Sequence, residues 1–386
     1  MNNQREFKKI ISDLKASCDL DLAQLKVQQD HPQKILGLMG YHFPEELFLA
    51  ADIHSLYLEP DNKPVMAADS LLQIFACSQV KSVLAQGLRG ELEPLDGIVF
   101  GHGCDSIKNV AGVWKLTFPE YFVDYFRYPT FPQARGTYEF LRAECARLLK
   151  RLQHVSGREI TEQDLERAIT IMTVIREKLT AVRELFLAHN HLFPYRDLLT
   201  VYRAVFKLEK TLIQEKLTQL LPVMEDCLKT NQSQGELTNN KQPIVVTGSR
   251  IDYWLVEDIE ECGASIVADD LYWGSRWLKT QMSNSSQKAA LDQIIDNLQQ
   301  RIIEPHNYDP HQARLKNIIK TVEKTNARGV LYIQYKFCES HAFEYPTFRA
   351  ELQKAAIPIY LIEIDTDYSA GREQIKNRIC SFIEMI

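Results

Sequence analysis

Residues 96–106 read DGIVFGHGCDS, and residues 328–340 read RGVLYIQYKFCES. Each stretch contains a run of apolar residues that predicts a buried strand, and each strand leads directly into a cysteine, Cys104 or Cys338. Helical patterns flank both strands, and alternation of strands with helices is typical of parallel sheets joined by right-handed crossovers. The two stretches therefore predict an α/β fold in which one kind of unit occurs twice.

The surrounding sequence supports this repeat. KILGLMGYHFPEELFLAADI (residues 34–53) and QPIVVTGSRIDYWLVEDIEECGASI (residues 242–266) each predict a strand, a turn containing glycine, and a helix. We interpret the two as copies of one open parallel-sheet domain, Rossmann-like or flavodoxin-like in type.

Four regions follow from this pattern. The expected domains are a helical lead-in at residues 1–33, a first α/β domain at 34–135, a helical segment with a linker at 136–240, and a second α/β domain at 241–386. The polar stretch KTNQSQGELTNNKQ, residues 229–242, has no periodicity and is the expected linker. Within the helical segment, Thr161 and Asp164 predict an N-cap.

The composition excludes several classes of protein. The chain has 386 residues, of which 45% are hydrophobic, and a net charge of -6 without a run of like charges. We therefore expect neither nucleic acid nor a polybasic membrane anchor as a partner. No stretch approaches the roughly 20 apolar residues that span a bilayer, and the N-terminus has no long apolar region, so the expected location is cytoplasmic.

The chain has eight widely spread cysteines, which predicts thiols or metal ligands rather than disulfides. Five of them fall in helical patterns and are interpreted as small buried hydrophobes: Cys18, Cys145, Cys227, Cys262 and Cys380.

The other three cysteines form the candidate site. Cys104 and Cys338 follow predicted strands, where ligands bind in open parallel sheets, and Cys104 also precedes a predicted helix whose free N–H groups favour an anion. Cys77, expected inside a helix over residues 68–90, is the candidate third ligand. No CxxC pair occurs. Spacing therefore leaves three interpretations open: buried hydrophobes, an iron-sulfur site, or a zinc site completed by His102 or His341.

Several motifs, in order, resemble one known family. They are FPEEL after a glycine-containing strand, ACSQVKS around Cys77, LDGIVFGHGCDSIKNVAGVW around Cys104, GASIVADDLYWGSRW, GVLYIQYKFC ending in Cys338, and the terminal NRICSFIEMI. Over residues 34–386 the chain resembles the 2-hydroxyacyl-CoA dehydratases and the related ATP-dependent benzoyl-CoA reductases. The resemblance implies a 4Fe-4S cluster between the two domains, bound by Cys77, Cys104 and Cys338, with one iron free of cysteine.

The resemblance also implies a function. Members of this family pass a low-potential electron to an acyl-CoA thioester, pair with a homologous second subunit, and are activated by a separate ATP-hydrolysing iron-sulfur protein. This chain has no GxxxxGK[ST] motif, so ATP chemistry belongs to a partner. The run CDSIKNVAGVWKLTFPEYF, residues 104–122, looks closest to the small subunit of benzoyl-CoA reductases. The alternatives are a double-cubane-cluster reductase of small molecules, a non-redox partner subunit, and a zinc-stapled binding protein.

Further site residues follow from the resemblance or from their position near the cysteines. Glu46 is the candidate proton-transfer group, with a solvated first-turn glutamate as the alternative, and Glu45 is expected to face solvent. The candidate cofactor-binding and substrate-binding residues are Ser78, Ser106, Gly248, Ser249, Arg250, Gly274, Ser275 and Arg276. The two serines would donate to cluster sulfur, and the two Gly-Ser-Arg loops would line an acyl-CoA pocket.

Two other positions carry weaker expectations. Asp269 and Asp270 end a predicted strand, where an N-cap role is the alternative to a site role. In the terminal helix, Asn377 and Cys380 stand where the family often has a small hydroxyl residue and an acid, so partner contacts of this helix are expected to differ.

Overall fold

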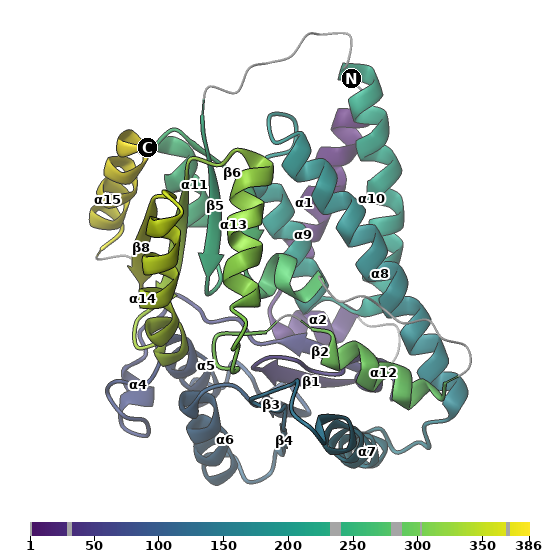
Figure 1. The fold of residues 1–386 in the computed structure, drawn as a ribbon. Coiled ribbons are helices and arrows are strands. Elements are labelled where there is room, and N and C mark those ends of the chain that lie inside the picture. Colours follow the sequence, from purple (N-terminus) through teal and green to yellow (C-terminus); the bar gives the residue numbers. More distant parts are fainter. Residues whose placement is uncertain (1, 29–32, 232–240, 279–287, 302, 368–370) are drawn as a thin grey trace.

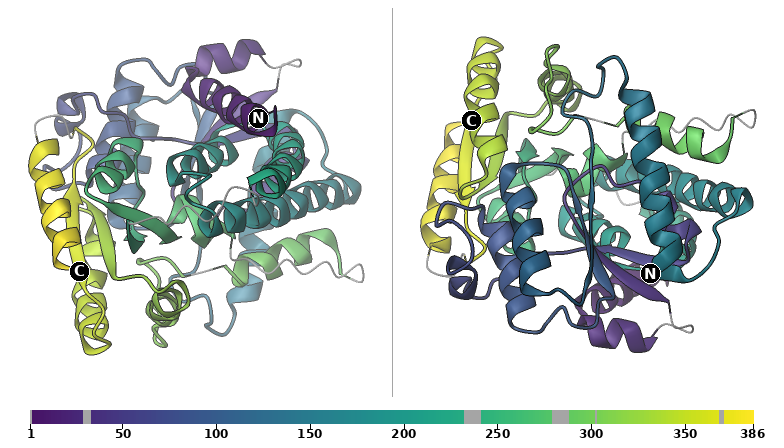
Figure 2. Two further views of the ribbon diagram at one scale, coloured as in Figure 1. Left: turned by 90° about the horizontal axis from the view of Figure 1, so that it is seen from above. Right: turned by 90° about the horizontal axis from the view of Figure 1, so that it is seen from below.

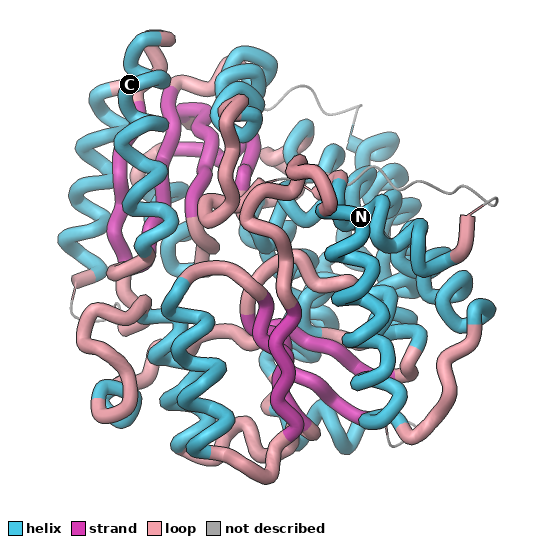
Figure 3. Tube along the Cα trace, turned by 60° about the horizontal axis from the view of Figure 1, so that its bottom comes forward, coloured by secondary structure: helices cyan, strands magenta, loops and turns pink. Residues whose placement is uncertain are grey.

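The computed structural model describes residues 2–28, 33–231, 241–278, 288–301, 303–367 and 371–386. The molecule is an α/β protein with two four-stranded sheets, both entirely parallel, as the sequence predicted (Figure 1). Figure 3 shows the sheets as two separate groups of strands. Most of the predicted linker, residues 232–240, lies outside the described residues.

The first sheet has the strand order β2-β1-β3-β4. Its strands are β1 (Lys34–Met39), β2 (Ile53–Tyr57), β3 (Gly97–Gly101) and β4 (Phe122–Phe126). Strand β2 was not predicted, because the five residues IHSLY carry no apolar run. All five are nevertheless buried, since the strand lies beneath helices of the central segment.

The second sheet has the same order, β6-β5-β7-β8. Its strands are β5 (Gln242–Gly248), β6 (Ala264–Asp270), β7 (Gly329–Tyr335) and β8 (Ile359–Ile364). The predicted repeat is therefore confirmed in topology: β1 corresponds to β5, β2 to β6, β3 to β7, and β4 to β8.

The strand order creates one ligand-binding crevice in each sheet. From β1 the chain passes to β2 on one side, and from β2 it crosses to β3 on the other side. Because the crossovers around β1 leave in opposite directions, the carboxyl ends of β1 and β3 border an open crevice, and the same holds for β5 and β7. Cys104 and Cys338 each lie three residues beyond such a strand end.

Four long helices separate the two sheets in the sequence. They are α7 (Thr137–Ser156), α8 (Glu162–Ala188), α9 (Tyr195–Lys207) and α10 (Lys210–Asn231). Helix α8 begins with the predicted cap, in which Thr161 and Asp164 exchange hydrogen bonds. Helices α8, α9 and α10 pack together with the N-terminal α1 (Asn2–Asp19) (Figure 1). In both views of Figure 2 this group lies on the side opposite the C-terminal helices.

The other helices lie before, between and after the strands. They are α2 (Leu22–Gln28), α3 (Glu45–Ala50), α4 (Met66–Asp69), α5 (Ser78–Leu88), α6 (Asp105–Thr117), α11 (Tyr253–Glu261), α12 (Ala290–Gln299), α13 (Ala313–Thr325), α14 (Glu339–Lys354) and α15 (Arg372–Met385). The helix predicted over residues 68–90 is in fact two helices, α4 and α5, interrupted over residues 70–77. Cys77 therefore lies at the N-cap of α5 and not inside a helix.

One expectation about the cysteines is wrong. Cys262, at the end of α11, forms a disulfide with Cys380 of α15, where buried thiols were expected. Arg372 and Lys376 of α15 also pair with Asp258 and Glu261 of α11, so charge pairing holds the two helices in contact. Among the residues described, the other six cysteines form no disulfide.

Among the residues described, no helix is both long enough and apolar enough to cross a bilayer.

Candidate functional site

Three cysteines from the two sheet units line one cavity. Cys77, Cys104 and Cys338 are the N-cap residues of α5, α6 and α14, and all three border the same space between the units, called here the three-cysteine cavity. Cys77 is buried, whereas Cys104 and Cys338 are partly exposed. The structure therefore brings together the three cysteines that the sequence analysis selected.

The helix termini make this cavity favourable for negative charge. Backbone N–H groups of each first turn favour the ionised form of the thiol: that of Gln79 acts on the pKa of Cys77, those of Ser106 and Ile107 on Cys104, and that of His341 on Cys338. The N-terminus of a helix also carries a partial positive charge. Three such termini converge on the cavity, so it is suited to thiolates or to an anionic group held by them.

Interactions among the thiols shift their pKa values in opposite directions. The Cys77 thiol donates to Cys338, which raises the pKa of Cys77 and lowers the pKa of Cys338. The His341 ring, whose Nδ1 lies 3.1 Å from the Cys338 sulfur, lowers the pKa of Cys338 further. Burial raises the pKa of Cys104 to about 11. Cys338 is therefore the thiol most readily ionised.

A glycine in the same place in each unit lets the backbone approach the crevice. Gly40, after β1, has a φ of +128°, and a Cβ atom there would lie 2.8 Å from the carbonyl oxygen of Gly101. Gly248, at the end of β5, has a φ of +105°, and a Cβ atom there would lie 2.0 Å from the carbonyl oxygen of Ile333. Both conformations favour glycine, because L side chains are strained there.

Tyr41 of the first unit and Tyr272 of the second unit form an aromatic wall. Tyr41 lines the cavity, packs edge-on against Tyr272 with ring centroids 4.6 Å apart, and is partly buried. Burial and the neighbouring thiols raise the pKa of its phenol well above the ordinary value. Tyr41 thus borders the same space as the three cysteines.

Glu46 is buried, so the alternative of a solvated glutamate is wrong. Its carboxylate pairs with the guanidinium of Arg176 at 2.8 Å, and it is not among the residues that line the three-cysteine cavity. The structure therefore does not bring Glu46 to the cysteines.

Glu45 is also buried, against the expectation that it faces solvent. It accepts hydrogen bonds from Trp277 at 2.7 Å and from Tyr57 at 3.1 Å, and Tyr57 in turn accepts one from Tyr272. Tyr57 and Tyr272 both line the three-cysteine cavity. Glu45 is thus connected to the cavity through two tyrosines. No sequence pattern distinguishes it from Glu46, because both lie in the first turn of α3.

The two Gly-Ser-Arg loops differ in their contribution. Ser249, Arg250 and Arg276 line the three-cysteine cavity. Gly248, Gly274 and Ser275 do not line it. The Ser275 backbone N–H and hydroxyl instead donate to Asp269, 2.7 Å and 2.5 Å away.

Asp269 and Asp270 fix neighbouring side chains and do not act as N-caps. Asp269 accepts from Ser275 and from Tyr202 of α9, and Asp270 accepts from Arg314 at 2.9 Å. Both carboxylates are buried, so their contacts hold the loop that carries Arg276.

The two serines beside the cysteines are buried. The Ser78 hydroxyl has no hydrogen-bond partner within the described part of the chain, and the Ser78 backbone N–H donates to the carbonyl of Lys336 at 3.3 Å. The Ser106 backbone N–H donates to the Cys104 sulfur. A buried hydroxyl without a partner next to Cys77 is suited to donate to a group held by the thiols.

The donor set fits an iron-sulfur cluster. Thiolates are the ligands of such clusters, and the sulfurs here lie around a cavity into which N–H groups point. Within the described residues, no group of three histidine, cysteine or acidic side chains is gathered so that it holds a metal ion directly. His341 touches Cys338, whereas His102 does not border the cavity.

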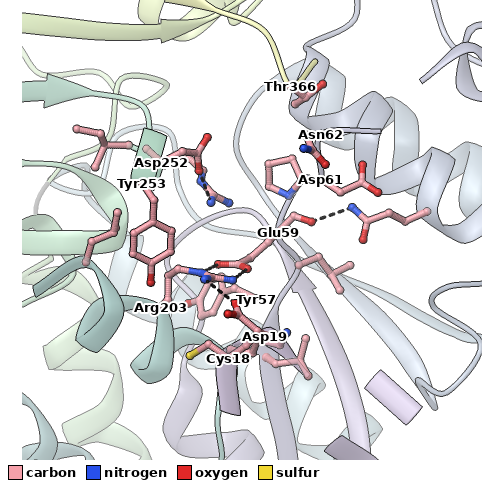
Figure 4. Close-up of a pocket in the computed structure, with 18 of the residues that line it drawn as sticks. Cys18, Asp19, Tyr57, Glu59, Asp61, Asn62, Arg203, Asp252, Tyr253 and Thr366 are labelled. Carbon is pink, nitrogen blue, oxygen red and sulfur yellow. Dashed lines mark hydrogen bonds and ion pairs between the residues drawn. The ribbon is translucent and has the colours of Figure 1, made fainter. Parts of the chain in front are cut away.

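A second space, called here the side cavity, adjoins the first. It measures about 640 Å³ and shares Tyr57, Leu58, Pro60 and Arg250 with the three-cysteine cavity. Volumes of roughly 300–1,000 Å³ are typical of small-molecule sites. Figure 4 shows Glu59 and Arg203 paired with one another in the side cavity, with Tyr253 beside Arg203 and Asp252 next to Tyr253.

Comparison with known proteins gives consistent matches. Residues 40–386 match the family model described as 2-hydroxyglutaryl-CoA dehydratase, D-component. The chain is 26% identical to the (R)-phenyllactyl-CoA dehydratase beta subunit of Clostridium sporogenes, with 94% of each chain covered. It is 26% identical to the lactoyl-CoA dehydratase beta subunit of Anaerotignum propionicum, covering 95% of this chain and 98% of the relative. It is 24% identical to a benzoyl-CoA reductase subunit of Thauera aromatica, with 95% of each chain covered.

Proposed function

The chain belongs to the family of the 2-hydroxyglutaryl-CoA dehydratase D-component, and we propose that it is the iron-sulfur subunit of an enzyme acting on acyl-CoA thioesters. Cys77, Cys104 and Cys338 would hold a 4Fe-4S cluster. The observation that carries the proposal is that three helix N-termini present these cysteines to one cavity. When bound, such a cluster supplies low-potential electron transfer, tuned by burial and by hydrogen bonds to sulfur.

The residues of the cavity have separate tasks in this proposal. The first-turn N–H groups and the Ser78 hydroxyl donate to sulfur, which stabilises negative charge on the cluster. The aromatic wall of Tyr41 and Tyr272 keeps water away from one side of the cavity. Arg250 and Arg276 place positive charge on the other side, where an acyl group would approach.

The partners in this proposal are a homologous second subunit and a separate ATP-hydrolysing iron-sulfur activator. All three relatives are named as single subunits of their enzymes, which supports the second subunit. Identities of 26% and 24% do not separate dehydratases from the ring reductase. We favour a benzoyl-CoA reductase-like role on the run of residues 104–122. Dehydration of a 2-hydroxyacyl-CoA is the second candidate, supported by the two dehydratase relatives.

Metal analysis tests the proposal directly. The chain, purified without oxygen, should contain roughly four irons and four acid-labile sulfides and show visible charge-transfer absorption. Fewer than about three irons, or stoichiometric zinc, would contradict it. Mixing the protein with its second subunit, an activator and ATP, and then supplying benzoyl-CoA or 2-hydroxyglutaryl-CoA, separates the two reactions. If neither thioester is consumed by an iron-loaded complex, the double-cubane-type reductase or the non-redox subunit replaces the proposed reaction.

The proposal retains Glu46 as the proton-transfer group, with Glu45 as its matched comparison. Glu46→Gln should lower turnover at least tenfold while iron content stays unchanged, since a single proton-transfer group contributes roughly 100-fold or more. If Glu46 only pairs with Arg176, the variant instead lowers the melting temperature and leaves kcat intact. A loss of turnover in Glu45→Gln alone would move the role to Glu45, which is connected to the cavity through Tyr57 and Tyr272.

A further inference from the structure

The side cavity contains three cationic side chains, and two of them have their donors occupied. Arg203 donates to both oxygens of Glu59, at 3.0 and 2.9 Å, and to Asp19 at 3.3 Å. Lys207 donates to the carbonyls of Cys18 and Leu20. Both cations are therefore already bonded to groups of the protein.

Arg250 is different. Its Nη2 donates to Asp252 at 2.6 Å, but its Nε and Nη1 atoms are buried and have no hydrogen-bond partner among the residues that the structure describes. Leaving a buried donor unsatisfied costs about 1–3 kcal/mol, and more for a charged group. A ligand that accepts from these atoms would remove that cost.

Arg250 is also held in place for such a ligand. Its guanidinium lies over the ring of Trp273, 4.7 Å from the centroid, and its side chain is 12% exposed. It lines both the side cavity and the three-cysteine cavity. The loop that carries it follows β5, where the crevice of the second sheet opens.

The acidic side chains of the side cavity do not leave a competing charge. Glu59 is paired with Arg203, and Asp61 accepts from Arg89 and from the Ser82 hydroxyl. Asp252 accepts from Arg250 and, on its other oxygen, from Tyr335 at 2.8 Å. Among the described charged residues of this cavity, Arg250 is therefore the one with buried nitrogen atoms that have no hydrogen-bond partner.

We propose that Arg250 binds an anionic oxygen of a ligand, a carboxylate or a phosphate, at the junction between the side cavity and the three-cysteine cavity. This inference rests on the proposed function, because it takes the side cavity as the path by which a thioester ligand reaches the cysteines. Guanidinium groups suit both kinds of anion, so the chemistry is shared by an acyl carboxylate and by the phosphates of coenzyme A.

Calorimetric titration of the anaerobically purified holoprotein tests the proposal. The probes are free coenzyme A, inorganic diphosphate and glutarate. At least one should bind the native protein, and Arg250→Gln should weaken that binding by roughly 10-fold to 100-fold, the effect of losing a charge-assisted hydrogen bond. Arg250→Lys should retain most of the affinity. Binding of diphosphate and coenzyme A identifies a phosphate site, whereas binding of glutarate alone identifies a carboxylate site.

A second variant distinguishes a lost ligand contact from misfolding. Asp252→Asn removes the carboxylate that competes for Arg250, so it should tighten binding, whereas a purely structural role predicts weaker binding in both variants. Arg196→Gln, on the exposed face of α9, is the matched control and should change nothing. Unchanged affinity in Arg250→Gln, or no binding of any probe to the native protein, would overturn the inference. Iron content is measured separately, so absence of iron with Arg250-dependent binding contradicts the proposed function alone.

Discussion

The two sheet units share a topology but contribute different chemistry to the site. Strands β3 and β7 lead into Cys104 and Cys338 in the same way, and the loops Gly40-Tyr41-His42 and Gly248-Ser249-Arg250 occupy the same place. The duplication therefore supplies two thiols related by the repeat. The third, Cys77, caps α5, and the corresponding helix of the second unit, α13, is capped by Gln312. A three-thiol site thus requires the copies to differ.

The second difference is electrostatic. The first unit presents the neutral phenol of Tyr41, whose pKa is raised, and the second unit presents the guanidinium of Arg250. A group held between the units is therefore shielded on one side and faces positive charge on the other. A repeated scaffold can thus place ligands at equivalent positions in its two copies. Single-residue differences between equivalent loops then make the two sides of the site electrostatically different.

The largest effect is expected from substitution of the cysteines that line the cavity. Cys104→Ala and Cys338→Ala should lower iron from roughly four per chain to near zero, and Cys77→Ala should do the same although it has no counterpart. Visible absorption and an iron assay measure this. Cys145→Ala and Cys227→Ala are the controls, since both are buried outside the cavity. Full iron retention in any of the first three would remove that residue from the ligand set.

The equivalent glycines give the next comparison. Gly248→Ala should destabilise the protein by about 4 kcal/mol, because backbone strain adds to a severe clash with Ile333, and Gly40→Ala by about 2 kcal/mol. Gly112→Ala, in α6, meets nothing within 4 Å and should stabilise by about 0.5–1 kcal/mol. Urea unfolding measures all three. A larger loss at Gly40 than at Gly248 would reverse the comparison.

The disulfide belongs to the second unit alone. Cys380→Ser should lower the free energy of unfolding by about 2–4 kcal/mol, because Cys262 and Cys380 close a long loop. Reductant should destabilise the native protein and leave the variant unaffected in a thermal melt. Equal melting temperatures with and without reductant would show that the bond does not form.

The last comparison concerns acid stability of the first unit. His54 lies opposite Ile35 in the first sheet, and Ser265 occupies the equivalent position opposite Pro243 in the second sheet. Burial lowers the pKa of His54 to about 4. Because the unfolded histidine titrates near 6.5, the stabilising contribution is present above that pH and is lost as the pH falls toward 4. The loss reaches about 3 kcal/mol at pH 4. His54→Ser should flatten this pH dependence in urea titrations; an identical slope in both proteins would exclude His54 as its source.

The sequence was sufficient for the architecture and for two of the three thiols. Apolar strands that end in Cys104 and Cys338 locate both residues at sheet crevices, because strand ends determine where ligands bind in parallel sheets. Cys77 came only from the family resemblance, since the segment before it has a helical period but lies outside a helix. The hydrophobic period of the sequence does not reveal that the helix is interrupted over residues 70–77.

The missed features depend on tertiary packing. Glu45 and Glu46 are adjacent in one helical turn, and only the position of Tyr57 determines that Glu45 is connected to the cavity. Cys262 and Cys380 are 118 residues apart, and their bond follows from the packing of α11 against α15. No local pattern contains either contact, so sequence reasoning treated the first as solvated and the second as two thiols.

The distribution of the three thiols has a consequence for biosynthesis. Cys77 and Cys104 are translated well before Cys338, which follows Cys104 by 234 residues. A nascent chain that has completed only its first sheet presents an incomplete set of ligands. Any group held by all three sulfurs must therefore be inserted after β7 has been translated, and once inserted it links the two sheet units.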